Sequence, residues 1–273
     1  MIEIKHLTRN YGNNKGVFDL SIKINEGEVF GFLGPNGAGK TTTIRHLMGF
    51  IKTDQGKCTI DGYDCWKDAD KIQKDVGYVP GEMTFFDEMT GYEYLLFIQK
   101  YRGLNEVNRK EELIERFELN PSGKIKKMSK GMKQKIGIVA ALMHDPKIII
   151  LDEPTSGLDP LMQNRFIDLI KEEKAKGKTI LLSSHIFEEV ERTCDRIGII
   201  KNGCLVALDT TEELRKKHLK TYVVTLDNEF LAKEFAKDFA GKQLEKSPTK
   251  VMVAKKQSLE EIFLTYYGGN NDD

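Results

Sequence analysis

This chain of 273 residues lacks the features that mark disulfide scaffolds and membrane-spanning proteins. Its cysteines form neither a C-x-x-C pair nor a dense framework, which favours reduced thiols in a cytoplasmic compartment. They are Cys58, Cys65, Cys194 and Cys204. The longest uncharged apolar stretch, Ile136–Met143, is far shorter than the roughly 18 residues that a membrane helix needs. Met1–Lys5 alternates like a strand and does not resemble a signal peptide. We therefore expect a soluble protein whose membrane role comes only through a partner.

The chain also lacks an excess of either charge. Its 42 basic residues balance its 42 acidic residues, so no overall field attracts nucleic acid, and we expect no nucleic-acid partner. One group of lysines is equally consistent with a solvated face and with attraction of phosphate. This group is Lys124, Lys126, Lys127, Lys130, Lys133 and Lys135. The length allows one large α/β domain with a small appendage, or two modest domains.

A glycine-rich loop is the most specific motif that is present. Residues 34–41 match G-x-x-x-x-G-K-[ST] without a gap, between an expected buried strand, Val29–Leu33, and an expected helix. Backbone N–H groups of such a loop and the following helix N-terminus form an anion site. A plain glycine turn would not need the full match, so we expect a nucleoside triphosphate here, with Lys40 at its phosphates and Thr41 at Mg²⁺. The expected contacts are Gly34, Pro35, Asn36, Gly37, Ala38, Gly39, Lys40, Thr41 and Thr42.

Two adjacent carboxylates, Asp152 and Glu153, end a second expected buried strand that begins at Lys147. The carboxyl end of a parallel strand is where ligands bind in open α/β sheets. One carboxylate could hold Mg²⁺ through its water shell, and the other could act as a base toward water. The alternative is a solvated junction between strand and loop, and the nearby phosphate loop makes it the weaker interpretation.

His185 follows another expected core strand, Thr179–Ser184. A lone histidine is usually structural, but this one would share the sheet edge with Asp152 and Glu153. Ser184 and His185 do not indicate a hydrolase, because no G-x-S-x-G elbow accompanies them. We therefore assign His185 to the nucleotide site.

The N-terminal segments Met1–Leu7 and Phe18–Ile24 alternate apolar and polar residues, as antiparallel strands with one wet face do. Tyr11 lies in the turn-rich stretch between them. An aromatic side chain there is usually core filler, but it could also stack on a base held by the phosphate loop.

The chain becomes helical over about 84–145. A capping box at Thr90 and Glu93 begins the first helix, and a second amphipathic helix is expected over about 106–117. A third helix follows Ser129–Gly131. Because the glycine adds no side chain, the N-terminus of this third helix is a second possible anion site.

The C-terminal part is expected to be a separate appendage. Asn202-Gly203 between apolar segments signals a hairpin, charge density then rises, and a linker is expected near 216–220. The tail indicates strand, helix, strand and helix, with Ser258 capping the last helix. It contains no recognisable catalytic constellation.

The order of these parts resembles the ATP-binding subunit of an ABC transporter over residues 1 to about 215. The specific evidence is the run from Leu151 to Pro160 (LDEPTSGLDP), preceded by Met128–Met132 (MSKGM) and followed by His185. The resemblance implies an α/β P-loop NTPase fold with a mostly parallel core sheet, an N-terminal antiparallel β subdomain and a helical subdomain at about 84–145. It divides the chain into an ATP-binding domain over 1–215 and a small α+β accessory domain over 221–267.

The resemblance also implies a role for each site residue. Two subunits would face head to tail, with ATP between the phosphate loop of one and Ser129 and Gly131 of the other. The remaining roles are Tyr11 stacking on adenine, Asp152 supporting Mg²⁺ beside Thr41, Glu153 polarising the attacking water, His185 contacting the γ-phosphate and Asp159 crossing the dimer seam.

Two departures from the family pattern matter. The usual Leu-Ser-Gly-Gly-Gln signature is Met128–Met132 here, and Lys130 adds a charge near the phosphate. Gly81 stands where the family has a glutamine that reaches Mg²⁺. Either the adjacent Glu82 reaches inward, or water replaces that ligand.

The implied function is ATP-driven dimer closure and hydrolysis that power a transporter, on the inner face of the cell membrane. The partners would be an integral-membrane permease and a second ATP-binding subunit, identical or related. The tail and the unusual signature resemble exporter-type cassettes, which favours export. A cleft between the helical block and the loop Gly81–Asp87 is expected to receive the permease, since Phe85, Phe86 and Met89 lie near it.

Two other functions remain as alternatives. A non-transport ABC protein, acting in translation or on chromosomes, commonly has two cassettes or a long coiled coil, and this chain has neither. A P-loop kinase would need an acceptor pocket and would not explain the segment Ser129–Gly131.

Overall fold

The computed structural model describes residues 1–86, 88–105, 108–244 and 247–267. The chain divides into two compact units, Met1–Leu208 and Asp209–Asp273. The first unit contains every candidate site residue. Among the helices in the described ranges, none is long and apolar enough to cross a membrane.

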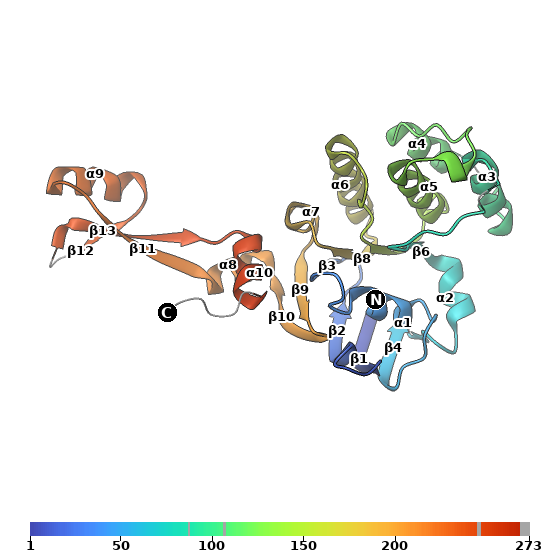
Figure 1. The fold of residues 1–273 in the computed structure, drawn as a ribbon, viewed down its shortest axis with the longest axis horizontal. Helices are drawn as coiled ribbons and strands as arrows, with labels where there is room; N and C mark the ends of the chain where they lie inside the picture. Colours follow the sequence, from blue (N-terminus) through green and yellow to red (C-terminus); the bar gives the residue numbers. More distant parts are fainter. Residues whose placement is uncertain (87, 106–107, 245–246, 268–273) are drawn as a thin grey trace. The chain divides into compact units, whose positions relative to one another are not determined.

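A six-stranded sheet in the order β10-β9-β3-β8-β7-β6 forms the centre of the first unit (Figure 1). From β6 through to β9 the neighbouring strands pair in parallel, so the predicted mostly parallel core is confirmed. Strands β3, β7 and β8 are buried along their whole length, which explains their continuous apolar runs. The bounds are β3 Val29–Leu33, β6 Val76–Val79, β7 Ile148–Asp152, β8 Thr179–Ser184, β9 Arg196–Lys201 and β10 Cys204–Thr210.

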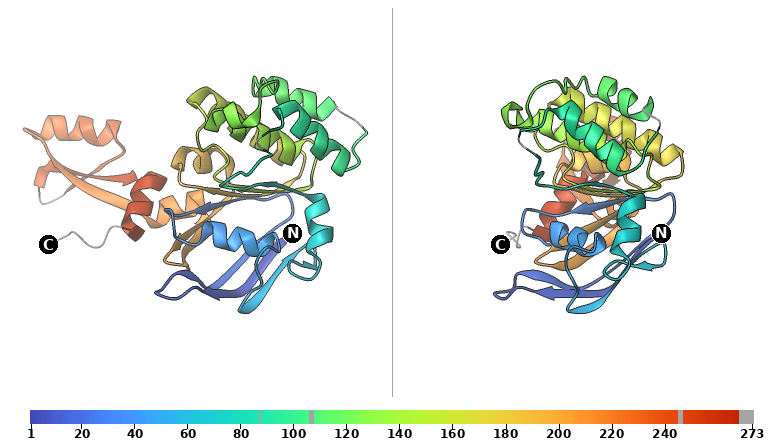
Figure 2. Two further views of the ribbon diagram at one scale, coloured as in Figure 1. Left: turned by 45° about the vertical axis from the view of Figure 1, so that its right-hand side comes forward. Right: turned by 90° about the vertical axis from the view of Figure 1, so that its right-hand side faces the viewer.

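A four-stranded sheet in the order β2-β1-β4-β5 forms the predicted antiparallel subdomain. Alternate side chains of its strands face a core that they share with the helix α1 (Lys40–Leu47) and one face of the central sheet. Figure 2 shows α1 lying between the two sheets. The bounds are β1 Ile2–Asn10, β2 Gly16–Ile24, β4 Gln55–Ile60 and β5 Tyr63–Asp64, with helix α2 at Ala69–Asp75.

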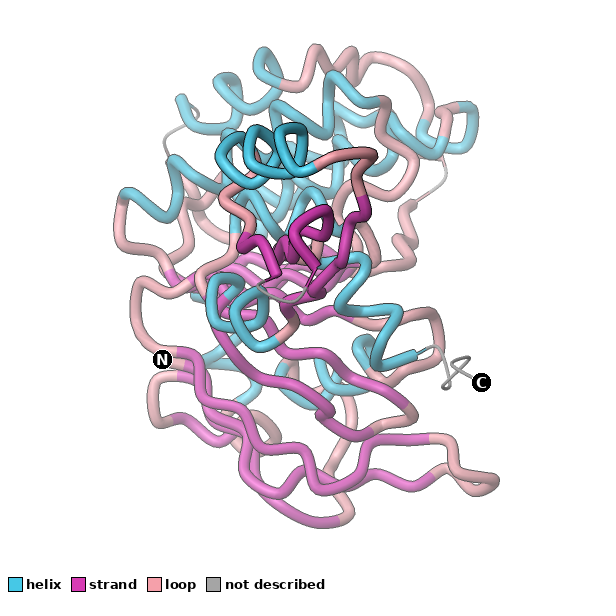
Figure 3. Tube along the Cα trace, turned by 90° about the vertical axis from the view of Figure 1, so that its left-hand side faces the viewer, coloured by secondary structure: helices cyan, strands magenta, loops and turns pink. Residues whose placement is uncertain are grey.

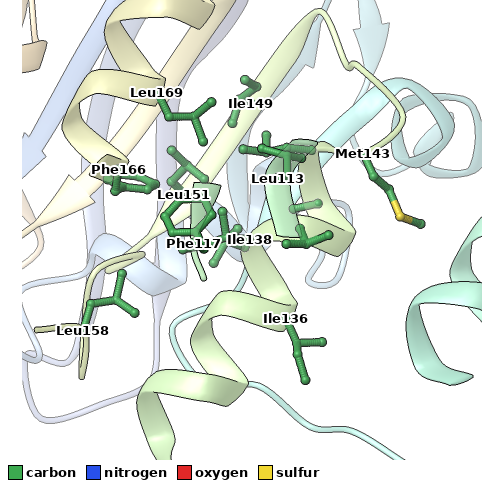
Figure 4. Close-up of a cluster of buried hydrophobic side chains, with 14 of the residues drawn as sticks. Leu113, Phe117, Ile136, Ile138, Met143, Ile149, Leu151, Leu158, Phe166 and Leu169 are labelled. Carbon is green, nitrogen blue, oxygen red and sulfur yellow. The ribbon is translucent and has the colours of Figure 1, made fainter. Parts of the chain in front are cut away.

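The opposite face of the central sheet carries the helical layer, which Figure 3 shows in cyan above the antiparallel strands. Ile149 and Leu151 of β7 point into this layer, and Figure 4 shows them beside Phe166 and Leu169. Ile148 and Ile150 face the other core, so β7 separates the two cores by simple alternation. The bounds are α3 Gly91–Tyr101, α4 Asn108–Arg116, η1 Ile125–Lys127, α5 Lys130–Leu142, α6 Pro160–Ala175 and α7 Phe187–Thr193.

Local signals explain several helix ends. The Thr90 hydroxyl accepts from the Glu93 N–H while the Glu93 carboxylate accepts from the Thr90 N–H, which confirms the predicted capping box. The second predicted helix corresponds to α4, and residues 106 and 107 of that prediction lie outside the described residues. Helix α7 was not predicted.

The second unit is a small α+β assembly whose three strands lie in the order β11-β13-β12, with antiparallel pairing. The linker predicted near 216–220 is wrong. Thr210 caps a helix that runs to Lys217, and β11 begins at Leu219. The charged residues that suggested a linker instead form ion pairs along this helix, as Lys216 does with Glu213. The bounds are α8 Thr211–Lys217, β11 Leu219–Thr225, α9 Glu229–Asp238, β12 Lys242–Leu244, β13 Ser247–Lys256 and α10 Leu259–Tyr267.

Candidate active site

The glycine-rich loop connects β3 to α1 at the carboxyl edge of the central sheet. Gly37 and Gly39 have φ values of +81° and +115°, a region that glycine enters without strain. Gly39 ends the loop, and no side chain caps α1, so the N–H groups of its first turn lack intrahelical partners. The loop and first turn hold all nine predicted contacts, with Pro35, Asn36 and Gly37 exposed, and Gly34, Ala38 and Lys40 buried.

The Lys40 ammonium lies inside this loop. It donates to the carbonyl oxygens of Gly34 at 2.5 Å and Pro35 at 3.2 Å. It also lies 3.3 Å from the Glu153 Oε1 atom. A buried cation needs such oxygen partners, and phosphate oxygens could supply the same contacts.

Asp152 joins the loop to the end of β7. The Thr41 hydroxyl donates to Asp152 Oδ2 at 2.7 Å, and the Ser183 hydroxyl donates to Oδ1. The carboxylate is fully buried. Two hard oxygen donors side by side suit Mg²⁺, which usually completes its shell with water and substrate phosphate, so these residues fit the predicted ion. Ser183 was not predicted, because only the β7–β8 register places it opposite Asp152.

Glu153 lies between Lys40 and His185. Its Oε2 atom is 3.3 Å from His185 Nδ1. Its side chain remains 21% exposed, so water can reach the carboxylate. The backbone has φ of +49°, a conformation that costs free energy in a residue other than glycine and often marks functional sites. The structure thus brings both predicted catalytic side chains together with the phosphate-loop lysine.

Tyr11 lies in the β1–β2 turn, where its N–H bonds to the Lys15 carbonyl. The turn adjoins the phosphate loop, since a Cβ placed on Gly39 would lie 3.3 Å from the Gly16 carbonyl oxygen. The ring is half exposed, and the Arg9 guanidinium carbon lies 5.2 Å from its centroid. The Arg9 guanidinium thus occupies one face of the ring, and stacking of Tyr11 on adenine stays a prediction.

Ser129, Gly131 and Asp159 lie at the starts of two neighbouring helices. Ser129 caps α5 and Asp159 caps α6 through their side-chain oxygens. A Cβ on Gly131 would lie only 2.6 Å from the Gly157 carbonyl oxygen, so glycine permits this close approach. Helices α5 and α1 pack on opposite faces of the central sheet, and the start of α5 lies against the loop that follows Glu153, where the Gln134 side chain donates to the Pro154 carbonyl oxygen.

The position of the absent glutamine lies directly against Asp152. A Cβ on Gly81 would be 3.2 Å from Asp152 Oδ2. The neighbouring Glu82 side chain is exposed. The structure therefore does not place the Glu82 carboxylate inward, beside Asp152.

Comparison with known proteins gives a family for this site. The ABC transporter family model matches residues 17–156. The chain is 39% identical over 219 residues to a linearmycin resistance ATP-binding protein of Bacillus subtilis, covering 78% of this chain and 70% of the relative. It is 40% identical over 223 residues to a bacitracin transport ATP-binding protein of Bacillus licheniformis, covering 81% of this chain and 73% of that relative.

A solved structure agrees with the fold. The dimeric structure of a bacterial ABC transporter cassette aligns with a TM-score of 0.69 and 25% identity, over 77% of this chain and 98% of that one. The chain therefore belongs to the ABC transporter family, as an ATP-binding subunit that hydrolyses ATP to power transport through a membrane-embedded partner.

Proposed function

We propose that this subunit drives export of a peptide, drug or lipid-like solute, working on the inner face of the cell membrane. The observation that carries the ATP-driven part of the proposal is the Glu153 carboxylate, held 3.3 Å from both Lys40 Nζ and His185 Nδ1 at the mouth of the phosphate loop. The relatives named for linearmycin resistance and bacitracin transport favour export over uptake.

Binding of ATP begins at the loop. Its backbone N–H groups and the α1 N-terminus surround the phosphates, and Lys40 exchanges its carbonyl partners for the β- and γ-phosphate oxygens. Tyr11 stacks on adenine at the rim. Thr41 and Asp152 would hold Mg²⁺, which would neutralise phosphate charge.

Hydrolysis needs a water molecule in line with the γ-phosphate. Glu153 accepts a hydrogen bond from this water and polarises it as a general base. His185 contacts the γ-phosphate and keeps the water aligned. The contact between the Glu153 and His185 side chains supports the two roles, because both must reach the attacking water beside the γ-phosphate.

A second subunit completes the site. Ser129 and the Gly131 N–H cap the γ-phosphate of the ATP held by the partner, and Asp159 crosses the seam. The exposure of Ser129 and Asp159 at helix N-termini supports this arrangement, and the dimeric form of the similar solved cassette agrees with it.

The membrane-embedded partner docks in a groove of about 820 Å³ below α3. Phe85, one of the residues predicted near this cleft, lies in its lining, while Phe86 is exposed and stacks edge-on against Phe97. Asp87 lies outside the described residues. The lining includes Phe50, Tyr78, Met83, Phe85, Tyr94 and Ile98, an apolar set that suits an amphipathic helix.

Purification from detergent-solubilised membranes tests the proposal. We expect the tagged chain to carry an integral-membrane protein with it, and inside-out vesicles of the pair to accumulate solute only with ATP. Co-purification with ribosomes or DNA would support the non-transport alternative. Phosphate release without an added acceptor would eliminate the kinase alternative.

A further inference from the structure

The turn between β9 and β10 lies against the nucleotide site, and the mechanism above gives it no role. Parallel pairing of β3 with β9 brings the ends of both strands to one edge of the central sheet, where Leu33 lies opposite Ile199. The phosphate loop follows β3 at this edge, and the turn Asn202-Gly203 follows β9. The Gly203 N–H donates to the Ala38 carbonyl oxygen of the phosphate loop at 2.9 Å. This hydrogen bond ties the turn to the loop.

The same glycine also holds the hairpin that carries Tyr11. The Gly203 carbonyl oxygen accepts a hydrogen bond of 2.9 Å from the Phe18 N–H of β2. The turn of Tyr11 is closed by a bond from its N–H to the Lys15 carbonyl oxygen, and β2 begins directly afterwards at Gly16. The turn therefore moves together with the start of β2. Gly203 thus connects the loop that would bind the phosphates with the turn that would bind the base.

The close approach of the backbone at Gly203 requires glycine. Its φ of +79° lies in the region that glycine enters without strain. A Cβ on Gly203 would lie 2.4 Å from the Gly16 carbonyl oxygen and 2.8 Å from the Phe18 ring. The same carbonyl oxygen faces the phosphate loop, since a Cβ on Gly39 would lie 3.3 Å from it. Three backbone segments therefore meet here at a spacing that one added methyl group would change.

We propose that Gly203 is a positioning residue for nucleotide binding: it sets the distance between the phosphate loop and the Tyr11 turn, so that one nucleotide reaches both. The inference rests on the proposed stacking of Tyr11 on adenine. The covalent structure of a nucleotide limits how far its base can lie from its phosphates. A turn displaced by about 1 Å would therefore lose much of the base contact, since positioned contacts tolerate little displacement.

The geometry also gives a direction to the effect of a substitution. The described atoms nearest to a Cβ on Gly203 belong to Gly16 and Phe18, on the side of the Tyr11 turn. Alanine keeps the N–H that bonds to Ala38, so the phosphate loop keeps this partner. Gly203→Ala should therefore displace the Tyr11 turn and leave the loop in place. Binding of the base should weaken, and binding of the phosphates should not.

Calorimetric titration with ADP and with pyrophosphate separates the two contacts, because both ligands carry a diphosphate and only ADP carries the base. Tyr11→Ala should weaken ADP binding by about fivefold to a hundredfold, as loss of base stacking does. Gly203→Ala should lose part of the same contribution, about threefold to thirtyfold for ADP, with pyrophosphate binding within about twofold of wild type.

Gly62→Ala is the matched control for backbone strain. Gly62 has φ of +83° and follows Asp61 at +49°, just as Gly203 at +79° follows Asn202 at +49°. A Cβ on Gly62 would meet no heavy atom of the described residues within 4 Å. This variant carries the same backbone strain without the close approach, so it should bind both ligands as wild type does.

Hydrogen exchange on wild-type protein keeps the proposal falsifiable if Gly203→Ala does not fold. ADP reaches both segments, so it should slow exchange of the Phe18 and Gly203 N–H groups more than saturating pyrophosphate does. Equal protection by the two ligands would contradict the positioning role.

The titrations overturn the inference if Gly203→Ala binds ADP as tightly as Gly62→Ala, or if it loses ADP and pyrophosphate affinity equally. Tyr11→Ala tests the proposed stacking separately. If Tyr11→Ala weakens ADP binding while Gly203→Ala does not, only the positioning role fails. If Tyr11→Ala binds ADP like wild type, the stacking itself is refuted, and the inference falls with it.

Discussion

The Thr41 hydroxyl donates a hydrogen bond of 2.7 Å to Asp152 Oδ2, across 111 positions of sequence. This bond joins the first turn of the phosphate-loop helix to the last residue of β7. The Ser183 hydroxyl satisfies the other carboxylate oxygen, so the Asp152 side chain is held from two sides before any ligand binds. Hydrogen bonds of this kind orient a carboxylate ligand before the metal binds.

Asp152→Asn should remove the advantage that Mg²⁺ gives to ATP binding. Asparagine keeps the size of the side chain but offers a neutral ligand, which binds Mg²⁺ less well than a carboxylate. We expect wild-type protein to bind ATP more tightly with Mg²⁺ than with EDTA, and the variant to show little difference. Nucleotide titration under both conditions measures this, and an undiminished Mg²⁺ effect would contradict the assignment.

Glu153→Gln should lower kcat by about 10²–10⁴, as loss of a general base does, and leave ATP binding intact. Lys40→Ala is the contrasting variant, because removal of the ammonium should weaken binding itself. Phosphate release and nucleotide titration on both proteins give the comparison. Native-rate hydrolysis by Glu153→Gln would refute the role of this carboxylate.

Lys130 should help to hold the signature segment in place. Its ammonium donates to Ser156 Oγ at 2.8 Å, and its stem lies across Gly157, where a Cβ would meet it at 3.0 Å. A hydrogen bond of this kind contributes about 0.5–1.5 kcal/mol, so Lys130→Met should raise the ATP concentration for half-maximal hydrolysis by about twofold to tenfold.

A double-mutant cycle tests whether Lys130 acts through its hydrogen bond to Ser156. Ser156→Ala should have a similar effect, and the double variant should be no worse than either single one. Lys127→Met, a nearby exposed lysine, serves as the control. Fully additive effects would mean that the two side chains act independently.

Protein stability should fall as the pH rises through neutrality, because of Glu189. Burial in the folded state raises the pKa of Glu189 to about 7, above its ordinary value of 4.5. The unfolded chain therefore loses this proton first, and the stabilisation present below pH 4.5 is lost as the pH approaches 7. The shift corresponds to at most about 3 kcal/mol.

Denaturation by urea at pH 5 and pH 8 measures this effect. The free energy of unfolding of wild-type protein should fall relative to that of Glu189→Gln across this interval. Identical pH profiles for the two proteins would show that Glu189 is already ionised in the fold.

Much of this site could be predicted because its parts are contiguous in sequence. The phosphate loop lies in one unbroken stretch, and Asp152 and Glu153 end an apolar run that can only be a buried strand. The hairpin turn at Asn202-Gly203 could also be predicted from two adjacent residues, and both have positive φ values in the structure. Such features depend on backbone chemistry within a few residues, which a sequence displays directly.

The contacts that support the site could not be predicted, because they depend on register and packing. Ser183 reaches Asp152 only through the pairing of β7 with β8. Glu189 looks like one of several acidic residues in a polar segment, and its burial follows from how the short helix α7 packs. The linker prediction failed for a related reason: charged residues that favour solvent also form the exposed, capped helix α8.

The central claim is that one subunit supplies half of each ATP site: its phosphate loop holds one nucleotide, and its Ser129 caps the nucleotide held by the partner. Analytical ultracentrifugation of Glu153→Gln protein saturated with Mg·ATP tests this most directly. We predict a dimer that disappears when Ser129 is also replaced by a bulky residue, or when ADP replaces ATP. A protein that stays monomeric at high concentration, even with its membrane partner present, would contradict the account.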